Sequence, residues 1–285
     1  MPSAELDQSY ALTEPQITQF RKEGFLRLPA VLSRDTLAAY APDIDAQVDA
    51  RNANRLIPLA ERSLYDQAFV QVSNLWETDE RVRELVFSRR LARVATQLLG
   101  TRGVRLWHDQ ALYKEPSGGF TPWHVDQQYW PMESSLSVTA WIPLQPVPLE
   151  MGPLCFGRGS HLKQIGRGLP ISAESERAIQ RAVGKQNIPE VQAPFALGDV
   201  SFHLGWTLHR AGPNTTETPR RVMTIIYMDI DMRLADPKNK FQQSDWERWT
   251  PNTRLGEVMN DPRNPVVYSD RTSTESSGKT DRWLM

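Results

Sequence analysis

The sequence predicts a mainly β protein with flanking helices, arranged as a double-sheet jelly roll. Three observations indicate this fold. Segments that read as strands follow one another after residue 100, and turns rich in Gly and Pro separate them. Helical patterns dominate the residues before that point. Nine tryptophans and 21 prolines suit strands and loops better than a helical bundle.

The whole chain, 1–285, is predicted to form a single domain, because neither a linker nor an internal repeat interrupts it. We divide it into a helical N-terminal cover (about 13–100), a jelly-roll core (about 101–231) and a C-terminal extension (about 232–285). The stretch 269–279 is rich in Ser, Thr and charged residues, and this composition favours disorder.

Helix signals recur through the N-terminal cover. Thr13 and Gln16 match a capping box, which predicts a helix from this point that stops at Gly24. The further elements are a strand at 25–28, a helix capped by Ser33, a loop over 51–62 and a helix over 79–99 with a break near Ser88.

The jelly-roll core is predicted from runs of apolar and alternating residues between turn signals. The strands are expected at residues 104–114, 121–130, 137–146, 153–156, 200–204, 207–211 and 221–231. A helix over 172–183 is expected between the two halves of the core.

Composition restricts the function. A net charge of −1 and a pI near 6.5 give no electrostatic footprint for nucleic acid or an anionic membrane. Cys155 is the single cysteine, which excludes an intrachain disulfide and favours a reducing compartment. The polar first ten residues do not resemble a signal peptide, and no apolar run is long enough to cross a bilayer. We expect a soluble, cytoplasmic protein with a small-molecule partner, and its oligomeric state is open.

A histidine and an aspartate two positions apart are candidate ligands of a metal ion. In a strand, side chains alternate between faces, so His124 and Asp126 would project from the same face of the strand predicted at 121–130. These are two of the three ligands of a 2-His-1-carboxylate triad, which leaves adjacent positions open on a non-haem Fe(II). On its own such a pair also occurs on ordinary surfaces.

A late strand of a jelly roll can supply the third ligand. His209 lies 85 positions after His124 (209 minus 124), and Arg220 follows His209 by 11 positions (220 minus 209). The Arg220 guanidinium can hold the far carboxylate of a dicarboxylic cosubstrate such as 2-oxoglutarate. His203 competes with His209, but only His209 is followed by Gly-Pro-Asn and then this arginine.

The ordered set of motifs resembles the phytanoyl-CoA dioxygenase family of Fe(II)/2-oxoglutarate-dependent oxygenases. The resemblance extends over roughly 13–227. The segments that carry it are 123–127, 139–144, 151–154, 159–161, 198–199, 209–214 and Arg220.

The resemblance implies a double-stranded β-helix and a set of site residues. His124, Asp126 and His209 match the iron ligands, and Arg220 matches the anchor of the 2-oxoglutarate carboxylate. Three further residues match cosubstrate contacts of the family, namely Trp141, Gln110 and Lys114. Residues near the first histidine are assigned to the organic substrate, namely Trp123, Gln127, Tyr129 and Trp130.

The reaction implied is hydroxylation of an unactivated C–H bond in a small organic metabolite, with 2-oxoglutarate and O2 converted to succinate and CO2. Asp126 argues against halogenation, because a small residue replaces this carboxylate in the related halogenases. Desaturation, epoxidation and ring formation stay open, and so does an acyl-CoA substrate.

Other interpretations stay open beside the oxygenase. A cupin-like protein that binds a metal or ligand without catalysis would not need Arg220, and a zinc hydrolase would leave Arg220 and Trp141 unexplained. His161 is expected to structure its loop, His108 is not expected to bind metal, and Cys155 is expected to be an inert thiol.

Overall fold

The computed structural model describes residues 2–54 and 56–270. The disorder predicted for 269–279 falls, after position 270, outside the described residues. The C-terminal extension joins the core, because its strand β11 (Val266–Ser269) pairs with β3 (Gly103–Tyr113).

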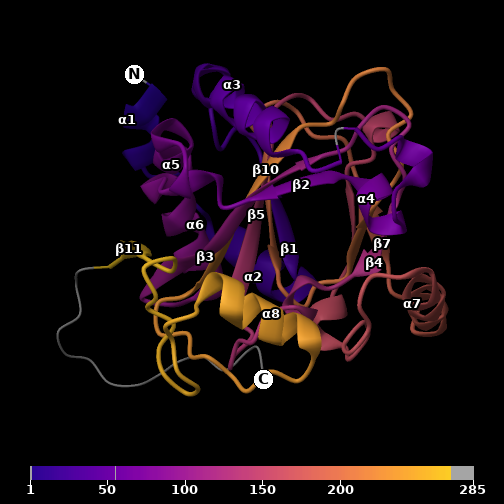
Figure 1. Ribbon diagram of the computed structural model, residues 1–285. Helices are drawn as coiled ribbons and strands as arrows, with labels where there is room; N and C mark the ends of the chain where they lie inside the picture. The colour runs from indigo at the N-terminus through magenta and orange to yellow at the C-terminus, as the bar shows by residue number, and fades with distance from the viewer. Residues whose placement is uncertain (1, 55, 271–285) are drawn as a thin grey trace.

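Two antiparallel sheets face each other and form the predicted jelly roll (Figure 1). The stacked rings of Phe25 and Phe156, one from each sheet, lie 4.4 Å apart between their centroids. The seven-stranded sheet runs β1 (Phe25–Leu28), β8 (Val200–Leu204), β5 (Ser137–Pro143), β10 (Val222–Asp229), β3, β11, with β2 (Val70–Ser73) also paired to β3. The four-stranded sheet runs β4 (Thr121–His124), β9 (His209–Ala211), β6 (Leu154–Gly157), β7 (Glu190–Gln192).

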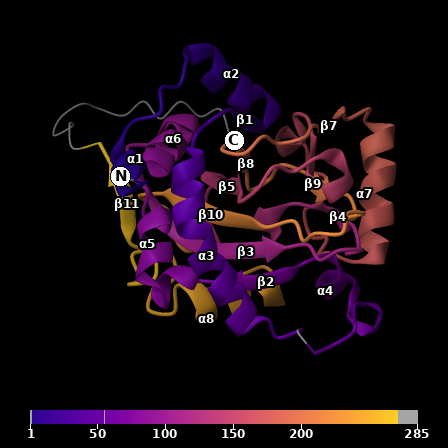
Figure 2. The ribbon, with the colours of Figure 1, turned by 90° about the horizontal axis from the view of Figure 1, so that it is seen from above.

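Helices from the first hundred residues cover the large sheet. Figure 2 shows α3, α5 and α6 along one side of it, while α7 stands at the opposite side of the molecule beside β4. Apolar side chains of α3, α5 and α6 join those of the large sheet in the main core. The α-helices are α1 (Pro2–Asp7), α2 (Glu14–Glu23), α3 (Arg34–Arg51), α4 (Leu64–Ala68), α5 (Glu80–Val86), α6 (Arg89–Leu99), α7 (Ala173–Lys185) and α8 (Lys240–Trp249). Short 3-10 helices are η1 (Leu59–Glu61), η2 (Leu75–Glu77), η3 (Asp126–Gln128), η4 (Leu149–Met151) and η5 (Ser160–Leu162).

The predicted helix boundaries of the cover are confirmed. Thr13 and Gln16 form a reciprocal capping box, and Gly24 ends α2 in the left-handed region with φ of 85°. Ser33 caps α3. The predicted break at Ser88 separates α5 from α6, and Ser88 itself caps α6.

The strand predicted over 121–130 is wrong after His124. Asp126 instead begins η3, because the backbone N–H of Gln127 donates to the carbonyl of Gly205 and the Gln127 side chain bonds to the 134–137 segment. These long-range contacts override the local strand pattern. The short strands β2, β7 and β11 and the helices α1, α4 and α8 were not predicted. No helix among the described residues has the length and apolar character needed to cross a membrane.

The cap at Ser88 allows a test of the fold. Its hydroxyl accepts from the Leu91 backbone N–H and donates to the Leu6 carbonyl, both at 3.3 Å. Ser88→Ala should therefore lower the free energy of unfolding by about 1–2 kcal/mol in denaturant titrations. Ser244→Ala, at an exposed position inside α8, is the control and should change stability by less than about 0.5 kcal/mol. Equal stability of Ser88→Ala and the control would show that this cap does not fix the α5–α6 junction.

Candidate metal and cosubstrate site

Pairing between two strands of the small sheet brings the predicted ligands together. His124 ends β4 and lies opposite His209, which begins β9. Val125 is extended, with φ of −126° and ψ of 133°, so Asp126 projects back to the side of His124 although β4 has ended. The ligand atoms of His124, Asp126 and His209 all lie within 4.8 Å of one another. Asp126 Oδ1 lies 3.6 Å from His124 Nε2 and 3.5 Å from His209 Nε2.

Hydrogen bonds select the same tautomer in both histidines of this group. His124 Nδ1 lies 2.8 Å from the carbonyl of Pro122, and His209 Nδ1 lies 3.0 Å from the carbonyl of Thr207. A carbonyl only accepts, so each Nδ1 carries the proton and donates. Each Nε2 then presents a lone pair toward Asp126 Oδ1, which is the arrangement that a metal needs.

Burial keeps these imidazoles neutral. It lowers the pKa of His124 and of His209 to about 4. Burial alone would raise the pKa of Asp126, but the imidazoles of His209, His203 and His124 outweigh it and hold that pKa well below its usual value. At neutral pH the group therefore offers two neutral nitrogen donors and one carboxylate.

His203, the competing histidine, lies beside the group and not in it. It is buried on β8, and its Nε2 lies 3.2 Å from Asp126 Oδ2, the oxygen on the far side from His124 and His209. The three-residue group with metal-ligand spacing consists of His124, Asp126 and His209.

A buried cation lies at the start of β10. Arg220 is 2% exposed and its guanidinium sits over the ring of Trp141, 5.5 Å from the ring centroid. One guanidinium N–H donates to the carbonyl of Gly152, and Nε has no hydrogen-bond partner within residues 2–54 and 56–270. No carboxylate of these residues forms an ion pair with Arg220. Burial lowers its pKa to about 10.

A second buried cation lies next to it. Lys114 and Arg220 exchange both backbone hydrogen bonds, at 2.9 and 2.8 Å, just after the end of β3 and just before the start of β10. The Lys114 ammonium donates to the Gly119 carbonyl and to Thr121 Oγ1, again without a carboxylate partner in the described part of the chain. Burial, with a contribution from Arg220, lowers the pKa of Lys114 to about 6.

Two of the sequence motifs pack around Arg220. Gly152 has φ of 66°, and a Cβ at this position would lie 2.2 Å from the carbonyl oxygen of Gly212. Only glycine fits this close approach, which leaves the Gly152 carbonyl facing Arg220. Asn214 is fully buried and its amide donates to the carbonyl of Lys114 at 3.1 Å, which ties the turn after β9 to β3.

Strand register places the other predicted cosubstrate residues between the triad and the two cations. Trp141 pairs with Thr224, and Thr224 pairs with Gln110, so the three residues form one row across β5, β10 and β3. The Gln110 side chain is half-buried and accepts a hydrogen bond from Gln71 of β2. The structure thus brings Trp141, Gln110, Lys114 and Arg220 to one end of the large sheet.

Two of the residues predicted to contact the substrate make structural contacts. Trp123 lies on the opposite face of β4 from His124, where Arg210 covers its ring and α7 packs against it. Gln127 is buried, and its amide bonds to the Ser134 carbonyl and the Ser137 hydroxyl. The structure does not bring the Trp123 ring to the triad.

The other two residues predicted to contact the substrate, Tyr129 and Trp130, lie closer to helix α8. Tyr129 is half-buried, accepts a hydrogen bond from the Ile171 backbone N–H at 2.8 Å and packs edge-on against Phe241. Trp130 is buried and its ring lies 6.5 Å from the ring of His108. Both residues follow η3 directly.

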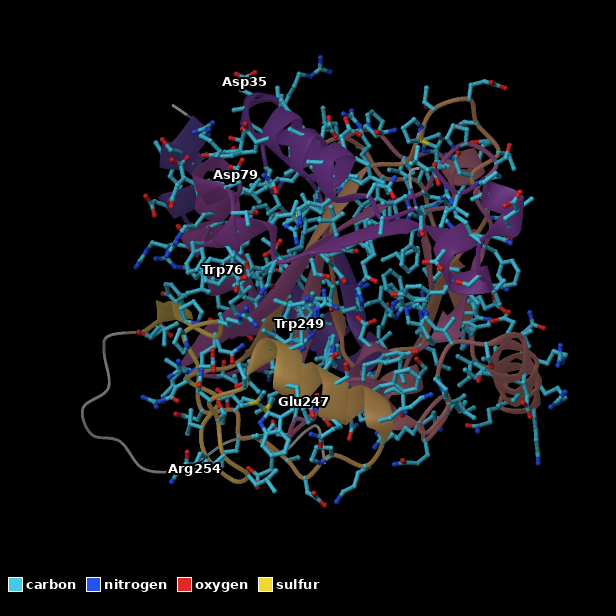
Figure 3. All side chains as sticks on the ribbon, in the orientation of Figure 1. Asp35, Trp76, Asp79, Glu247, Trp249 and Arg254 are labelled. Carbon is cyan, nitrogen blue, oxygen red and sulfur yellow. The ribbon has the colours of Figure 1, made fainter. Side chains whose placement is uncertain are left out.

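Helix α8 packs next to η3, and the sequence did not reveal it. Trp249, labelled in Figure 3 at the end of α8, stacks on His108 with ring centroids 4.9 Å apart. At the start of the helix, Asn239 and Gln242 both donate to the carbonyl of Gln128, at 3.3 Å. The aromatic residues of 241–249 were a signal for a buried helix face that could have predicted α8.

His161 and Cys155 have structural roles. His161 Nε2 lies 3.0 Å from the carbonyl of Arg21, which ties η5 to α2 and agrees with the predicted loop-structuring role. Cys155 is buried on β6, and burial raises the pKa of its thiol. This agrees with the prediction of an inert thiol.

Comparison with known proteins identifies relatives along most of the chain. Residues 20–222 match the family "Phytanoyl-CoA dioxygenase (PhyH)". The methylphosphonate hydroxylase of Gimesia maris is 23% identical over 243 residues, which is 82% of this chain and 90% of the relative. The Stutzerimonas stutzeri protein named "Probable alpha-ketoglutarate-dependent hypophosphite dioxygenase" is 26% identical over 156 residues. That match takes in 53% of this chain and about half (54%) of the relative's length.

A solved structure shows the same fold. The epimerase SnoN, in complex with Fe3+, alpha-ketoglutarate and nogalamycin RO, superposes with a TM-score of 0.74 and 25% identity, covering 94% of this chain and 100% of SnoN. The site residues present fit such ligands, with a His-Asp-His group for iron and two buried cations for a dicarboxylate. The chain belongs to the phytanoyl-CoA dioxygenase family and is a non-haem iron- and 2-oxoglutarate-dependent oxygenase.

Proposed function

We propose that His124, Asp126 and His209 hold Fe(II), and that Arg220 and Lys114 bind the far carboxylate of 2-oxoglutarate. One observation carries the second assignment: Arg220 and Lys114 are buried side by side without a carboxylate partner among the described residues, and burial lowers the pKa of Lys114 to about 6, so Lys114 needs a bound anion to keep its proton at neutral pH. A buried, unpaired charge is costly, so this site needs an anion. A dicarboxylate that reaches from the metal to Arg220 meets that need.

The donor set supports iron. Two neutral imidazoles and one carboxylate form the facial arrangement of non-haem Fe(II) oxygenases, in which the remaining metal positions take cosubstrate and O2. Bound Fe(II) and 2-oxoglutarate supply O2 activation for oxidation of a C–H bond, with succinate and CO2 as coproducts. The chain's own residues orient these ligands: Nδ1 bonds to Pro122 and Thr207 fix the two imidazoles, and Trp141 gives the cosubstrate an apolar wall.

The organic substrate is proposed to be a small metabolite that is hydroxylated. Helix α8, fastened to Gln128 and stacked on His108, covers the side of the site next to η3. The aromatic residues near η3, among them Tyr129 and Trp130, suit contact with a small organic molecule. The substrates after which two relatives are named, methylphosphonate for the Gimesia maris hydroxylase and ectoine for the ectoine dioxygenase of Streptomyces avermitilis, support the same size class. The lone buried Cys155 supports a cytoplasmic location.

The two rival functions explain fewer of these features. A zinc hydrolase or a cupin-like binding protein can use the same three ligands, since zinc accepts His and Asp. Neither needs two buried cations at the far end of the sheet. Retention of Asp126 argues for hydroxylation over halogenation.

Removal of the proposed anchor should separate metal binding from cosubstrate binding. Arg220→Leu keeps an apolar stem beside Trp141 but removes the charge-assisted bonds to the carboxylate. We expect the Kd for 2-oxoglutarate, measured by calorimetry on Mn(II)-loaded protein, to rise on the order of 100-fold, equal to about 3 kcal/mol. The affinity for Mn(II) should change little.

Arg221→Leu is the matched control for this experiment. Arg221 is the next residue, yet its guanidinium is partly exposed and pairs with Asp45 and Gln145. The control should bind 2-oxoglutarate as the wild type does. Equal losses of cosubstrate affinity in both variants, or parallel losses of metal and cosubstrate in Arg220→Leu, would contradict the anchor role.

Lys114 should make the stability of the ligand-free protein depend on pH. Burial and Arg220 lower its pKa from 10.5 to about 6, so between these values the unfolded chain binds one proton more than the folded chain. Stability should therefore rise with pH in this window, by at most about 1.4 kcal/mol per pH unit. Denaturant titrations between about pH 6.5 and 8.5 should show this slope in the wild type and lose it in Lys114→Met.

Lys185→Met serves as the control, because Lys185 is exposed at the end of α7. It should keep the wild-type slope. Parallel curves for the wild type and Lys114→Met would show that the Lys114 ammonium keeps its charge in the folded protein and does not need a bound anion.

A further inference from the structure

The two oxygens of the Asp126 carboxylate have different surroundings. Oδ1 faces the Nε2 atoms of His124 and His209. Oδ2 instead lies 3.1 Å from Thr139 Oγ1 and 3.2 Å from His203 Nε2. One oxygen therefore points to the proposed metal position, while two side chains hold the other.

Both contacts to Oδ2 are hydrogen bonds in which the carboxylate accepts. A carboxylate that binds a metal is deprotonated, so Asp126 in this role has no proton to donate. His203 must then carry its proton on Nε2, which is the opposite tautomer to that of His124 and His209. The Nδ1 atom of His203 has no hydrogen-bond partner in the described part of the chain, as expected for an imidazole fixed through Nε2 alone.

The two donors stand on neighbouring inner strands of the large sheet. Thr139 of β5 and His203 of β8 are direct register partners near the middle of the large sheet. They are 3% and 1% exposed, and the ring of His203 packs 5.4 Å from the ring of Phe156. Asp126, in contrast, stands on a short 3-10 turn. The sheet can therefore fix the position of a carboxylate that its own turn would hold less firmly.

We propose that His203 and Thr139 are positioning residues that restrict Asp126 to binding the metal through Oδ1 alone. This inference depends on the proposed iron site. A carboxylate with both oxygens free can chelate a metal and occupy a second coordination position. Two hydrogen bonds on Oδ2 hold that oxygen away from the metal and prevent chelation. The open positions on the metal therefore stay available for the cosubstrate and O2.

Substitutions that remove each donor while keeping shape test this role. Thr139→Val replaces the hydroxyl by a methyl group of similar size, and His203→Phe places a ring in apolar surroundings. Partners that orient a metal ligand are typically worth 10- to 100-fold in metal affinity. We expect each variant to bind Mn(II) about 10- to 100-fold more weakly in equilibrium titrations followed by tryptophan fluorescence.

Conservative variants and a matched control complete the experiment. Thr139→Ser and His203→Gln keep a donor and should return to within about threefold of the wild-type affinity. Thr224→Val removes an equally buried hydroxyl on the next strand, one that donates to the Gln110 carbonyl and not to Asp126, and should bind Mn(II) as the wild type does. Thermal unfolding of the metal-free proteins checks that each variant folds. Should His203→Phe fail to fold, Thr139→Val tests the same oxygen.

The possible results are distinct. Wild-type affinity in both Thr139→Val and His203→Phe would overturn the inference and leave the iron site standing. Equal weakening in His203→Phe and His203→Gln, with no effect of Thr139→Val, would also overturn it, because His203 would then act as a metal ligand itself. Failure of the wild-type chain to bind Mn(II) or Fe(II) would overturn the proposed function, and this inference with it.

Discussion

The pairing of β4 with β9 is the constraint on which the site depends. It sets His124 opposite His209, with ring centroids 4.1 Å apart, although 85 positions separate them in the chain (209 minus 124). The backbone hydrogen bonds between β4 and β9 therefore bring together two histidines that lie far apart in the sequence. The carbonyls two residues before each histidine then fix both tautomers. Asp126 arrives from the turn after β4, and the large sheet holds its second oxygen through Thr139 and His203.

The basic side chains of Lys114 and Arg220 at the large sheet complement the negative charge of a dicarboxylic cosubstrate. Asp126 of the proposed metal site contacts Thr139 within β5, and the bridge between Lys114 and Arg220 lies just outside the paired ends of β3 and β10. In the absence of an anion, the burial of Arg220 and Lys114 opposes folding, and Lys114 lowers that cost by releasing its proton. The close approach of Gly152 to Gly212 leaves the Gly152 carbonyl facing Arg220. The apolar residues around Trp141 exclude water, which strengthens any ion pair formed there.

The sequence predicted the jelly roll, the capped helices and the triad, because each depends on local patterns or on ordered motifs. It predicted a strand through Asp126, and this was wrong, since the contacts of Gln127 with Gly205 and the 134–137 segment are long-range. The place of His203 beside Asp126 follows from strand register, which spacing along the chain does not reveal. Helix α8 was missed, and so was its stacking on His108. Trp123 was assigned to the substrate, but alternation along β4 turns its ring toward α7.

The most direct test of the iron and 2-oxoglutarate site is an anaerobic titration of the metal-free protein with Fe(II) and then 2-oxoglutarate, followed by visible absorption. Chelation of Fe(II) by a 2-oxo acid gives a weak charge-transfer band that a zinc site cannot produce. We expect the band to appear only when both are present and to saturate at one cosubstrate for each iron. Binding of Fe(II) without a band on addition of 2-oxoglutarate would contradict the cosubstrate site and favour a protein that binds metal for another purpose.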